Sequence, residues 1–300
     1  MEDGEASWVC GCEELRSAGA VEWEPASKGK TMGDLRDVSK TMLLTLYARA
    51  NYSKGEKALF HDAKAEEVVD RLDYDFAAAS KDFAMSSGTI ARTLVFDELV
   101  GGFIVEHPEA IVVNIGSGLD TRFYRIDNGA IGWYNVDLPD AMEVRNEILP
   151  PVQREHNIAA SAMDPSWANR VGGGDMLFVI EGLTMYLEAG DIAQMLSIIR
   201  DSFDNALVMM ETTSAFWVSK QGVEKSVQET GSKFTWGCDS FEDLGELAKG
   251  FVKVADDDIL RGMEQLYPAY RLIDWIPFVK KAAEKILVFR KDENATIGSK

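Results

Sequence analysis

The stretch that decides the fold is IVVNIGSGLDTR, residues 111–122. Its first five residues are mostly β-branched and apolar, and they predict a short buried strand. The strand ends at Gly116, and Gly118 follows; two glycines permit a tight turn and a close approach of the backbone to a ligand. A helix that begins directly after such a turn offers free N–H groups. The stretch therefore predicts a strand, a ligand-facing loop and the start of a helix.

The same alternation of strands and helices continues along the chain. We expect further strands at 131–136, 159–163, 176–180, 206–210 and 286–289, with helical patterns between them. Pro139 suits the first turn of one of these helices, and Asp191 is expected to cap another. Nearly continuous apolar strands that alternate with helices indicate an α/β fold whose parallel sheet is covered on both faces.

Composition narrows the class of protein. The 300 residues include 31 basic and 50 acidic ones, a formal net charge of −19, which argues against binding to nucleic acid or to an anionic membrane. No apolar run is long enough to span a bilayer, and the acidic amino terminus does not resemble a secretory signal. Three cysteines fit a reducing cytoplasm better than a disulfide framework. Cys10 and Cys12 lack a second pair of ligands, so we expect no metal site.

Acidic residues stand where strands are expected to end. Ligands of open α/β sheets bind outside the carboxyl ends of the strands. Asp137 ends the second strand, 21 residues after Gly116, and an acid at that position can accept both hydroxyls of a ribose. The pair predicts a site for an adenosine-bearing cofactor, although the two glycines alone also suit an ordinary tight turn.

The nature of the cofactor follows from two further residues. A dinucleotide-binding loop has a third glycine where this chain has Thr121. Glu181, at the end of the fourth strand, suits a cation better than a pyrophosphate. S-adenosylmethionine carries a sulfonium, an ammonium and a carboxylate but no phosphate, so these residues favour it over a nicotinamide cofactor, which stays an alternative.

Several segments in order resemble one known family. They are 40–50, Arg92-Thr93 with Asp97, 113–125, 136–140 and 181–187. Together they resemble motifs of the leucine carboxyl methyltransferase family, and more closely its bacterial branch, typified by the tetracenomycin polyketide O-methyltransferase. The resemblance covers roughly residues 36–290.

The resemblance implies a class I S-adenosylmethionine-dependent methyltransferase fold: Rossmann-like, with a seven-stranded sheet whose last strand is antiparallel. Residues 1–35 would form an irregular arm, and residues 36–300 a single methyltransferase domain. Within that domain we expect a helical addition at 36–107, the cofactor-binding sheet at 108–212, a substrate lid at 213–270 and a carboxyl-terminal strand region at 271–300.

The resemblance also implies roles for individual residues. Arg92 would pair with the cofactor carboxylate, Gly116 and Gly118 would lie against the cofactor, Asp137 would hold the ribose, Asp164 would lie near the adenine, and Glu181 would approach the ammonium. Arg49 and Tyr186 are further candidates that would face the cofactor or the acceptor.

Most of these residues also have purely structural interpretations. Arg92 could pair with Asp97 on its own helix, and Asp164 could cap the turn that contains Pro165. Tyr186 could belong to the core, while Arg122 and Arg125 could brace the acidic rim of the sheet.

The function that these patterns predict is transfer of a methyl group to a carboxylate or hydroxyl of a small molecule, such as a polyketide-type secondary metabolite. A carboxylate acceptor is ionised near neutral pH and needs no general base, so we assign no catalytic residue beyond those that position the reactants. The alternatives are a protein carboxyl methyltransferase that modifies a partner's carboxy-terminal residue, and a cofactor-binding protein without turnover.

Overall fold

The computed structural model describes residues 40–77, 79–219, 234–273 and 275–292. The predicted arm at 1–35, which includes Cys10 and Cys12, lies outside the described residues.

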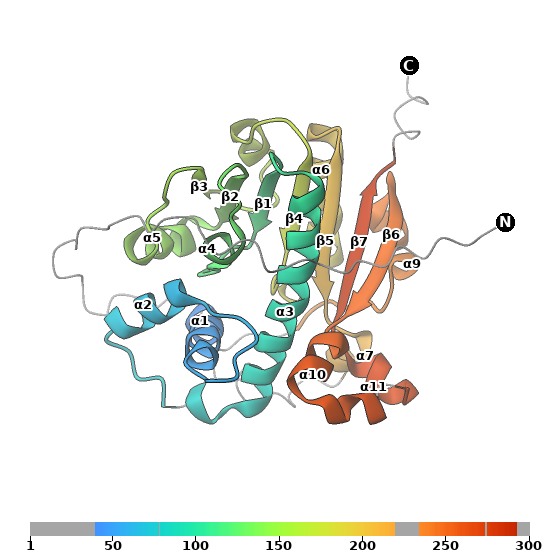
Figure 1. The fold of residues 1–300 in the computed structure, drawn as a ribbon. Coiled ribbons are helices and arrows are strands. Elements are labelled where there is room, and N and C mark those ends of the chain that lie inside the picture. Colours follow the sequence, from blue (N-terminus) through green and yellow to red (C-terminus); the bar gives the residue numbers. More distant parts are fainter. Residues whose placement is uncertain (1–39, 78, 220–233, 274, 293–300) are drawn as a thin grey trace, which may run out of the picture.

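Seven strands form one mixed sheet. They are β1 (Ile111–Ile115), β2 (Gly132–Asp137), β3 (Glu155–Ala159), β4 (Met176–Ile180), β5 (Ala206–Thr212), β6 (Phe251–Asp258) and β7 (Lys285–Lys291). Their order is β3-β2-β1-β4-β5-β7-β6, and β7 runs antiparallel to both of its neighbours (Figure 1). The strand order reverses between β1 and β4, which is where open α/β sheets bind their ligands. The predicted seven-stranded sheet with an antiparallel last strand is confirmed.

Ten α-helices surround the sheet in the described part of the chain. They are α1 (Lys40–Ser53), α2 (Ala63–Arg71), α3 (Phe83–Glu106), α4 (Arg122–Ile126), α5 (Pro139–Ile148), α6 (Ala189–Ser202), α7 (Ala215–Ser219), α9 (Phe241–Leu244), α10 (Leu260–Leu266) and α11 (Pro277–Ala282). Short 3-10 helices are η2 (Ala79–Lys81), η3 (Pro165–Arg170), η4 (Thr184–Tyr186), η5 (Gly245–Ala248) and η6 (Pro268–Leu272). None of these described helices is both long and apolar enough to cross a bilayer.

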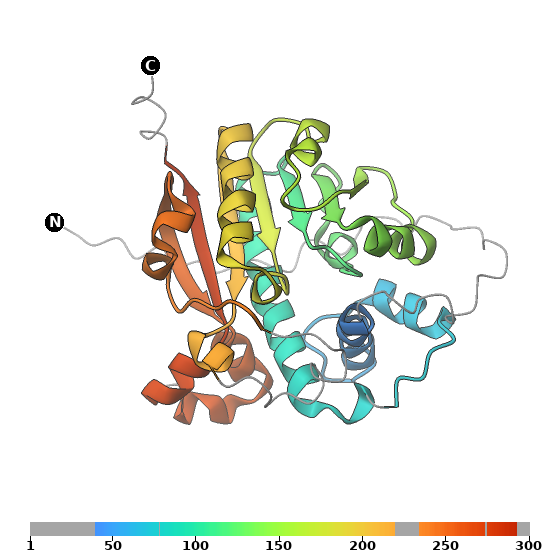
Figure 2. The same cartoon turned by 180° about the vertical axis from the view of Figure 1, so that it is seen from behind.

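The sheet is covered on both faces, as expected. On one face, α3 and α4 pack against β1, β2 and β4 through residues such as Phe96, Phe123 and Leu177. On the other face, α6 packs against β4 and β5 through residues such as Met195 and Phe178 (Figure 2). A third, smaller cluster joins α1 and α2 to the loop after β1. Helices α1, α2, α7, α10 and α11 lie at one end of the sheet (Figure 1).

One predicted strand position is wrong and one strand was not predicted, and both errors concern edge strands. The third strand occupies Glu155–Ala159 rather than 159–163. Its residues are mostly polar, and Glu155 is nevertheless buried because it pairs with Arg145. Strand β6 lies inside 213–270, which was expected to cover the sheet rather than to join it. Because β6 pairs on one side only, its exposed residues give no apolar run.

Helix α3 begins at Phe83, after Asp82, whose side chain accepts the N–H of Met85. One predicted helix cap needs correction. Asp191 does not cap α6 directly; it is the third residue of a capping box whose cap is Glu188. Pro139 does stand at the start of α5, as predicted.

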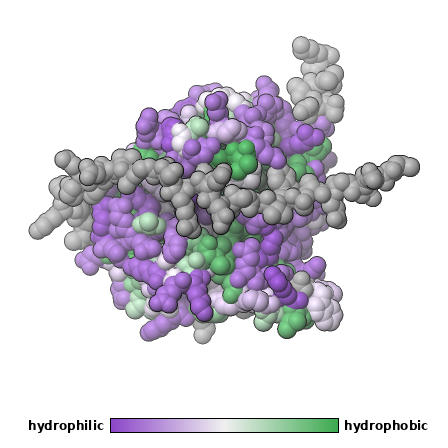
Figure 3. Space-filling view, in the orientation of Figure 1, coloured by the Kyte–Doolittle hydropathy of each residue, from purple (hydrophilic) through white to green (hydrophobic). Residues whose placement is uncertain are grey.

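The surface in Figure 3 is mostly hydrophilic, with hydrophobic residues near its centre and toward the lower right, where α10 and α11 lie. Leu272, Trp275 and Phe278 are exposed large apolar side chains at that end.

Helix α10 lies so close to α3 that only glycine fits at one position. A Cβ atom at Gly262 would overlap the backbone carbonyl of Ala91, whereas a Cβ at Gly88, in α3, would meet nothing within 4 Å. We expect Gly262→Ala to lower the free energy of unfolding by about 1–3 kcal/mol or more through overpacking. The matched control, Gly88→Ala, should raise it by up to about 1 kcal/mol through helix propensity. Denaturant unfolding measures both, and equal stability of the two variants would contradict this packing.

Candidate functional site

The loop after β1 is held tightly at both glycines. Gly116 and Gly118 adopt φ angles of +71° and +44°, a region that favours glycine. A Cβ at Gly116 would lie 3.0 Å from the side chain of Leu183, and a Cβ at Gly118 would lie 3.1 Å from Met42 of α1. The loop therefore lies between α1 and the turn after β4, and both glycines are required by conformation and by space.

Asp137, at the end of β2, holds the same loop. Its Oδ2 accepts the N–H of Gly118 at 2.7 Å, and its Oδ1 accepts the N–H of Leu138 at 2.7 Å. Burial raises the pKa of Asp137, although these two N–H groups act in the opposite direction. Each carboxylate oxygen can accept a further hydrogen bond, so Asp137 can contact a ligand without releasing the loop.

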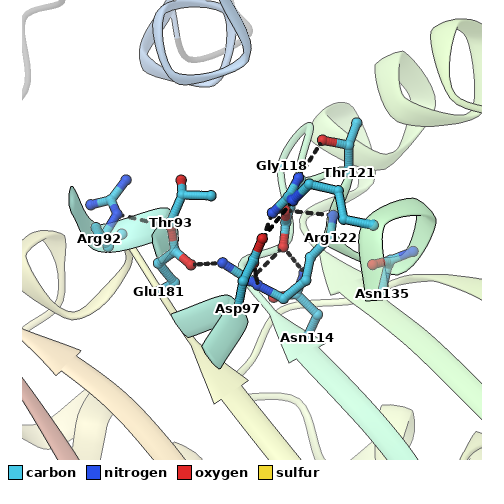
Figure 4. Close-up of polar contacts among 12 residues, drawn as sticks. Arg92, Thr93, Asp97, Asn114, Gly118, Thr121, Arg122, Asn135 and Glu181 are labelled. Atoms are coloured by element: carbon cyan, nitrogen blue, oxygen red, sulfur yellow. Dashed lines mark hydrogen bonds and ion pairs between the residues drawn. The ribbon is translucent and has the colours of Figure 1, made fainter. Parts of the chain in front are cut away.

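Arg122 is the centre of a buried ion-pair cluster. Its guanidinium contacts Asp97 of α3 at 2.7 Å, Asp120 of the loop at 2.8 Å and Glu181, after β4, at 2.5 Å (Figure 4). The side chain of Arg122 is 1% exposed. Burial by itself would raise the pKa of Asp97, but the guanidinium groups of Arg125 and Arg122 lower it below its usual range. The cluster joins a helix, the loop and a strand end through charge-assisted hydrogen bonds.

A second buried acid extends this cluster toward α1. Asp62 caps α2 and accepts hydrogen bonds from Arg125 at 2.6 Å, Thr121 at 2.5 Å and Arg49 at 3.1 Å. Arg49 also donates to the carbonyl of Leu119 at 2.9 Å. Arg49 thus fastens α1 to the loop, and these contacts show it in a structural role.

Arg92 lies between two acids at the ends of β4 and β5. Its Nη1 donates to both carboxylate oxygens of Glu211, at 3.1 and 3.2 Å. Its Nε lies 2.8 Å from Glu181 Oε1, but the N–H is not aligned for a hydrogen bond, so this contact is ionic only. The alternative that Arg92 pairs with Asp97 is wrong, since Asp97 instead receives Arg122 and Arg125.

Glu211 is a buried acid that the sequence analysis did not select. It is fully buried, and its Oε2 accepts the N–H of Gly182 at 2.6 Å. Burial raises the pKa of Glu211 to about 8, although the charge of Arg92 acts against the rise. Its position at the end of β5, equivalent to that of Asp137 on β2, is a signal that could have identified it.

The remaining candidates lie apart from these contacts. Asp164 is exposed and caps η3 by accepting the N–H of Ser166, which is the capping role considered for it. Tyr186 is half-buried in η4, with its ring 5.9 Å from that of Phe234. The interpretation of Arg122 and Arg125 as braces of the acidic rim is confirmed.

Comparison with known proteins identifies the family. The family model of leucine carboxyl methyltransferases matches residues 42–200. The tetracenomycin polyketide synthesis O-methyltransferase TcmP of Streptomyces glaucescens is 33% identical over 208 residues, which cover 68% of this chain and 76% of TcmP. This chain belongs to the leucine carboxyl methyltransferase family. The predicted family and enzyme class are confirmed.

Further similarities agree with the assignment of this chain to a methyltransferase family. An S-adenosyl-L-methionine-dependent methyltransferase, dpfgK of Gibberella zeae, is 25% identical over 240 residues, which cover 72% of this chain and 80% of dpfgK. The crystal structure of a DUF574 family protein from Streptomyces avermitilis matches with a TM-score of 0.55 at 14% identity, covering 84% of this chain and 97% of that one. A methyltransferase structure from Thermobifida fusca matches with a TM-score of 0.51 at 15% identity, covering 82% and 94%. At these identities the two structures show the fold alone.

The buried position of Asp62 makes a stability prediction. Asp62→Asn leaves Arg49 and Arg125 short of a negative charge inside the methyltransferase, and we expect a loss of about 3–5 kcal/mol in the free energy of unfolding. Asp70 pairs with Lys54 at the surface, so the control Asp70→Asn should change stability by less than about 1 kcal/mol. Urea unfolding gives both values; a similar small change in the two variants would show that the buried cluster is not needed.

Proposed function

We propose that this methyltransferase transfers the methyl group of S-adenosyl-L-methionine to an oxygen atom of a small molecule, a carboxylate or hydroxyl of a polyketide-type metabolite. The observation that carries the proposal is the arrangement at the strand ends. Asp137, at the end of β2, binds the glycine-rich loop, while Arg92 and Glu181 lie at the end of β4, on the other side of β1. The name of the relative TcmP, a polyketide O-methyltransferase, supports the acceptor class.

The residues present fit this cofactor. Among the described residues, Ser117 Oγ in the glycine-rich loop is buried and has no hydrogen-bond partner, as expected of a group that meets a ligand. Asp137 has acceptor capacity to spare for ribose hydroxyls. Arg92 suits a carboxylate and Glu181 an ammonium, because each brings the opposite charge to a site with little solvent.

We assign the cofactor contacts accordingly. Arg92 would bind the carboxylate, Gly116 and Gly118 would let the methionine part approach the backbone, and Asp137 would bind the ribose. Glu181 would attract the ammonium. Asp164 would lie near the adenine. Its Oδ1 accepts the N–H of Ser166, and its Oδ2 can accept a hydrogen bond from the ligand.

The cofactor supplies an electrophilic methyl group on a sulfonium, and the chain supplies positioning. Holding an acceptor oxygen in line with such a carbon can lower the activation barrier by roughly 7–11 kcal/mol. A carboxylate acceptor is already ionised near neutral pH, so no side chain has to remove a proton. Tyr186 lies in η4, shortly after Glu181, and would face the cofactor or the acceptor.

Exclusion of water is the second task of the chain. We propose that parts of 213–270 other than β6 act as the substrate lid. Phe216 and Trp217 of α7 contact each other, and Trp217 donates to the carbonyl of Ala282 at 2.6 Å, so α7 is tied to α11. Aromatic side chains at this position would keep the reacting atoms dry, which favours a reaction between an anion and a sulfonium.

We place this activity in the cytoplasm, on a small-molecule acceptor and without a nucleic acid or membrane partner, given the charge of −19 and the three cysteines.

Replacement of Asp137 tests the cofactor site. We expect the wild type to bind S-adenosyl-L-methionine in the micromolar range and Asp137→Ala to bind about 10–100-fold more weakly, because charged hydrogen bonds to the ribose are lost. Asp140→Ala is the matched control, since Asp140 is an exposed acid in the first turn of α5. Isothermal calorimetry measures all three affinities. A folded wild type that does not bind the cofactor would overturn the proposal.

Alkali treatment of the product tests the acceptor. With methyl-labelled cofactor and polyketide acids or phenols, we expect label in small molecules. A methyl ester releases labelled methanol in mild alkali, whereas a methyl ether keeps its label, so the treatment separates carboxylate from hydroxyl acceptors. Label found only in protein would favour the protein carboxyl methyltransferase instead.

A further inference from the structure

A buried carboxylate, Glu211, holds the turn that carries Glu181. It accepts the N–H of Gly182 at 2.6 Å, and its own main-chain carbonyl accepts the hydroxyl of Thr184 at 2.6 Å. Gly182 adopts a φ of +67°, and a Cβ there would lie 3.8 Å from the guanidinium of Arg92. The end of β5 therefore sets the path of the chain after β4 directly beneath Arg92.

Glu211 also pairs with Arg92, the cation that the proposed cofactor site needs. Arg92 Nη1 contacts both of its oxygens, while Arg92 Nε faces Glu181. Glu181 has a second cation, Arg122, at 2.5 Å, whereas Arg92 is the cation that contacts Glu211. An incoming carboxylate would therefore compete with Glu211, rather than with Glu181, for the charge of Arg92.

We propose that Glu211 is a positioning residue that exchanges its charge for that of the cofactor: in alkaline solution its carboxylate neutralises Arg92 in the free enzyme, and it takes up a proton when the cofactor carboxylate pairs with Arg92. This inference rests on the proposed function, which assigns that carboxylate to Arg92. The proton comes from the solvent and resides on Glu211 Oε1, which Arg92 can release, because Oε2 accepts the N–H of Gly182.

Charge balance in the buried site supports the exchange. The charged groups that face Glu211 are Arg92 from α3, Glu181 from the turn after β4, and Glu284 just before β7; Arg122 acts through Glu181. The cofactor ammonium would pair with Glu181, but the cofactor carboxylate would take Arg92 from Glu211 and leave Glu211 as a buried charge without a partner, which is costly. Protonation of Glu211 removes that charge at little cost, because burial already raises its pKa to about 8.

The exchange predicts how affinity depends on pH. Below pH 7, Glu211 is already mostly protonated and Arg92 is available, so the affinity should not depend on Glu211. Above pH 8, each unit of pH should weaken binding about tenfold, because Glu211 must take up one proton from the solvent for each cofactor bound. The ligand's own amine also titrates near pH 8, so wild type and variant must be compared.

The test measures the affinity for S-adenosylhomocysteine, which has the same carboxylate and withstands alkaline pH, between pH 6 and 9.5. Glu211→Gln has no proton to exchange. We expect it to bind within about threefold of the wild type at pH 6.5 and at least tenfold more tightly than the wild type at pH 9.5. A residue that is only structural would weaken binding equally at every pH. That outcome, or parallel profiles, would overturn the inference and leave the proposed function intact.

A second variant tests the direction of the effect. Glu284 raises the pKa of Glu211 by its negative charge, which also acts on Arg92. Glu284→Gln should therefore move the midpoint of the affinity profile to lower pH and keep its slope. An unchanged midpoint or a shift to higher pH would contradict the role of Glu211 as the titrating group.

Proton counting covers the case in which Glu211→Gln does not fold. Calorimetry of the wild type at pH 8.5 in two buffers of different ionisation enthalpy gives the protons taken up per ligand. Uptake beyond the contribution of the ligand's amine supports the exchange, and no excess overturns it. A wild type that binds neither the cofactor nor its demethylated product at any pH would overturn the proposed function as well.

Discussion

The structure depends on one buried guanidinium. Arg122 holds an acid of α3, an acid of the glycine-rich loop and the acid after β4, and these three lie far apart in the sequence. Buried ion pairs of this kind add little net stability over apolar packing, but loss of one partner is expensive. The cluster therefore fixes relative position: the loop, α3 and the end of β4 can move only together. A site that must hold a cofactor and an acceptor in line benefits from this rigidity.

The central strands could be predicted because their sequences report their burial. Residues 176–180 are apolar throughout and 111–115 are apolar except for Asn114, and both predictions match β4 and β1 at every position. The edge strands could not be predicted in this way. In β3 the buried Glu155 is neutralised by Arg145 from α5, and this pairing depends on tertiary structure. In β6 most side chains face solvent, so the strand has the composition of a loop.

Residues of the candidate site likewise divide into those that local sequence predicts and those that depend on tertiary contacts. Gly116, Gly118 and Asp137 could be selected from spacing, because a turn and a strand end impose local requirements on residue type. Asp62 could not be selected from local pattern, because it is defined by arginines from other elements, whereas the local signal of Glu211 is its place at the end of β5. For Arg49, the family motif suggests a ligand contact, and the structure adds contacts with Asp62 and with the carbonyl of Leu119 that no local pattern predicts.

The proposed function requires that the strand ends form one pocket for a cofactor with an amino-acid part and a nucleoside part. A crystal structure of the protein with S-adenosylhomocysteine would show this pocket. We expect the ribose hydroxyls on Asp137, the sulfur beside the Gly116 turn and the carboxylate on Arg92, with the Arg122 cluster unchanged. A ligand bound elsewhere, or one whose carboxylate leaves Arg92 paired with Glu211 as in the free protein, would contradict it.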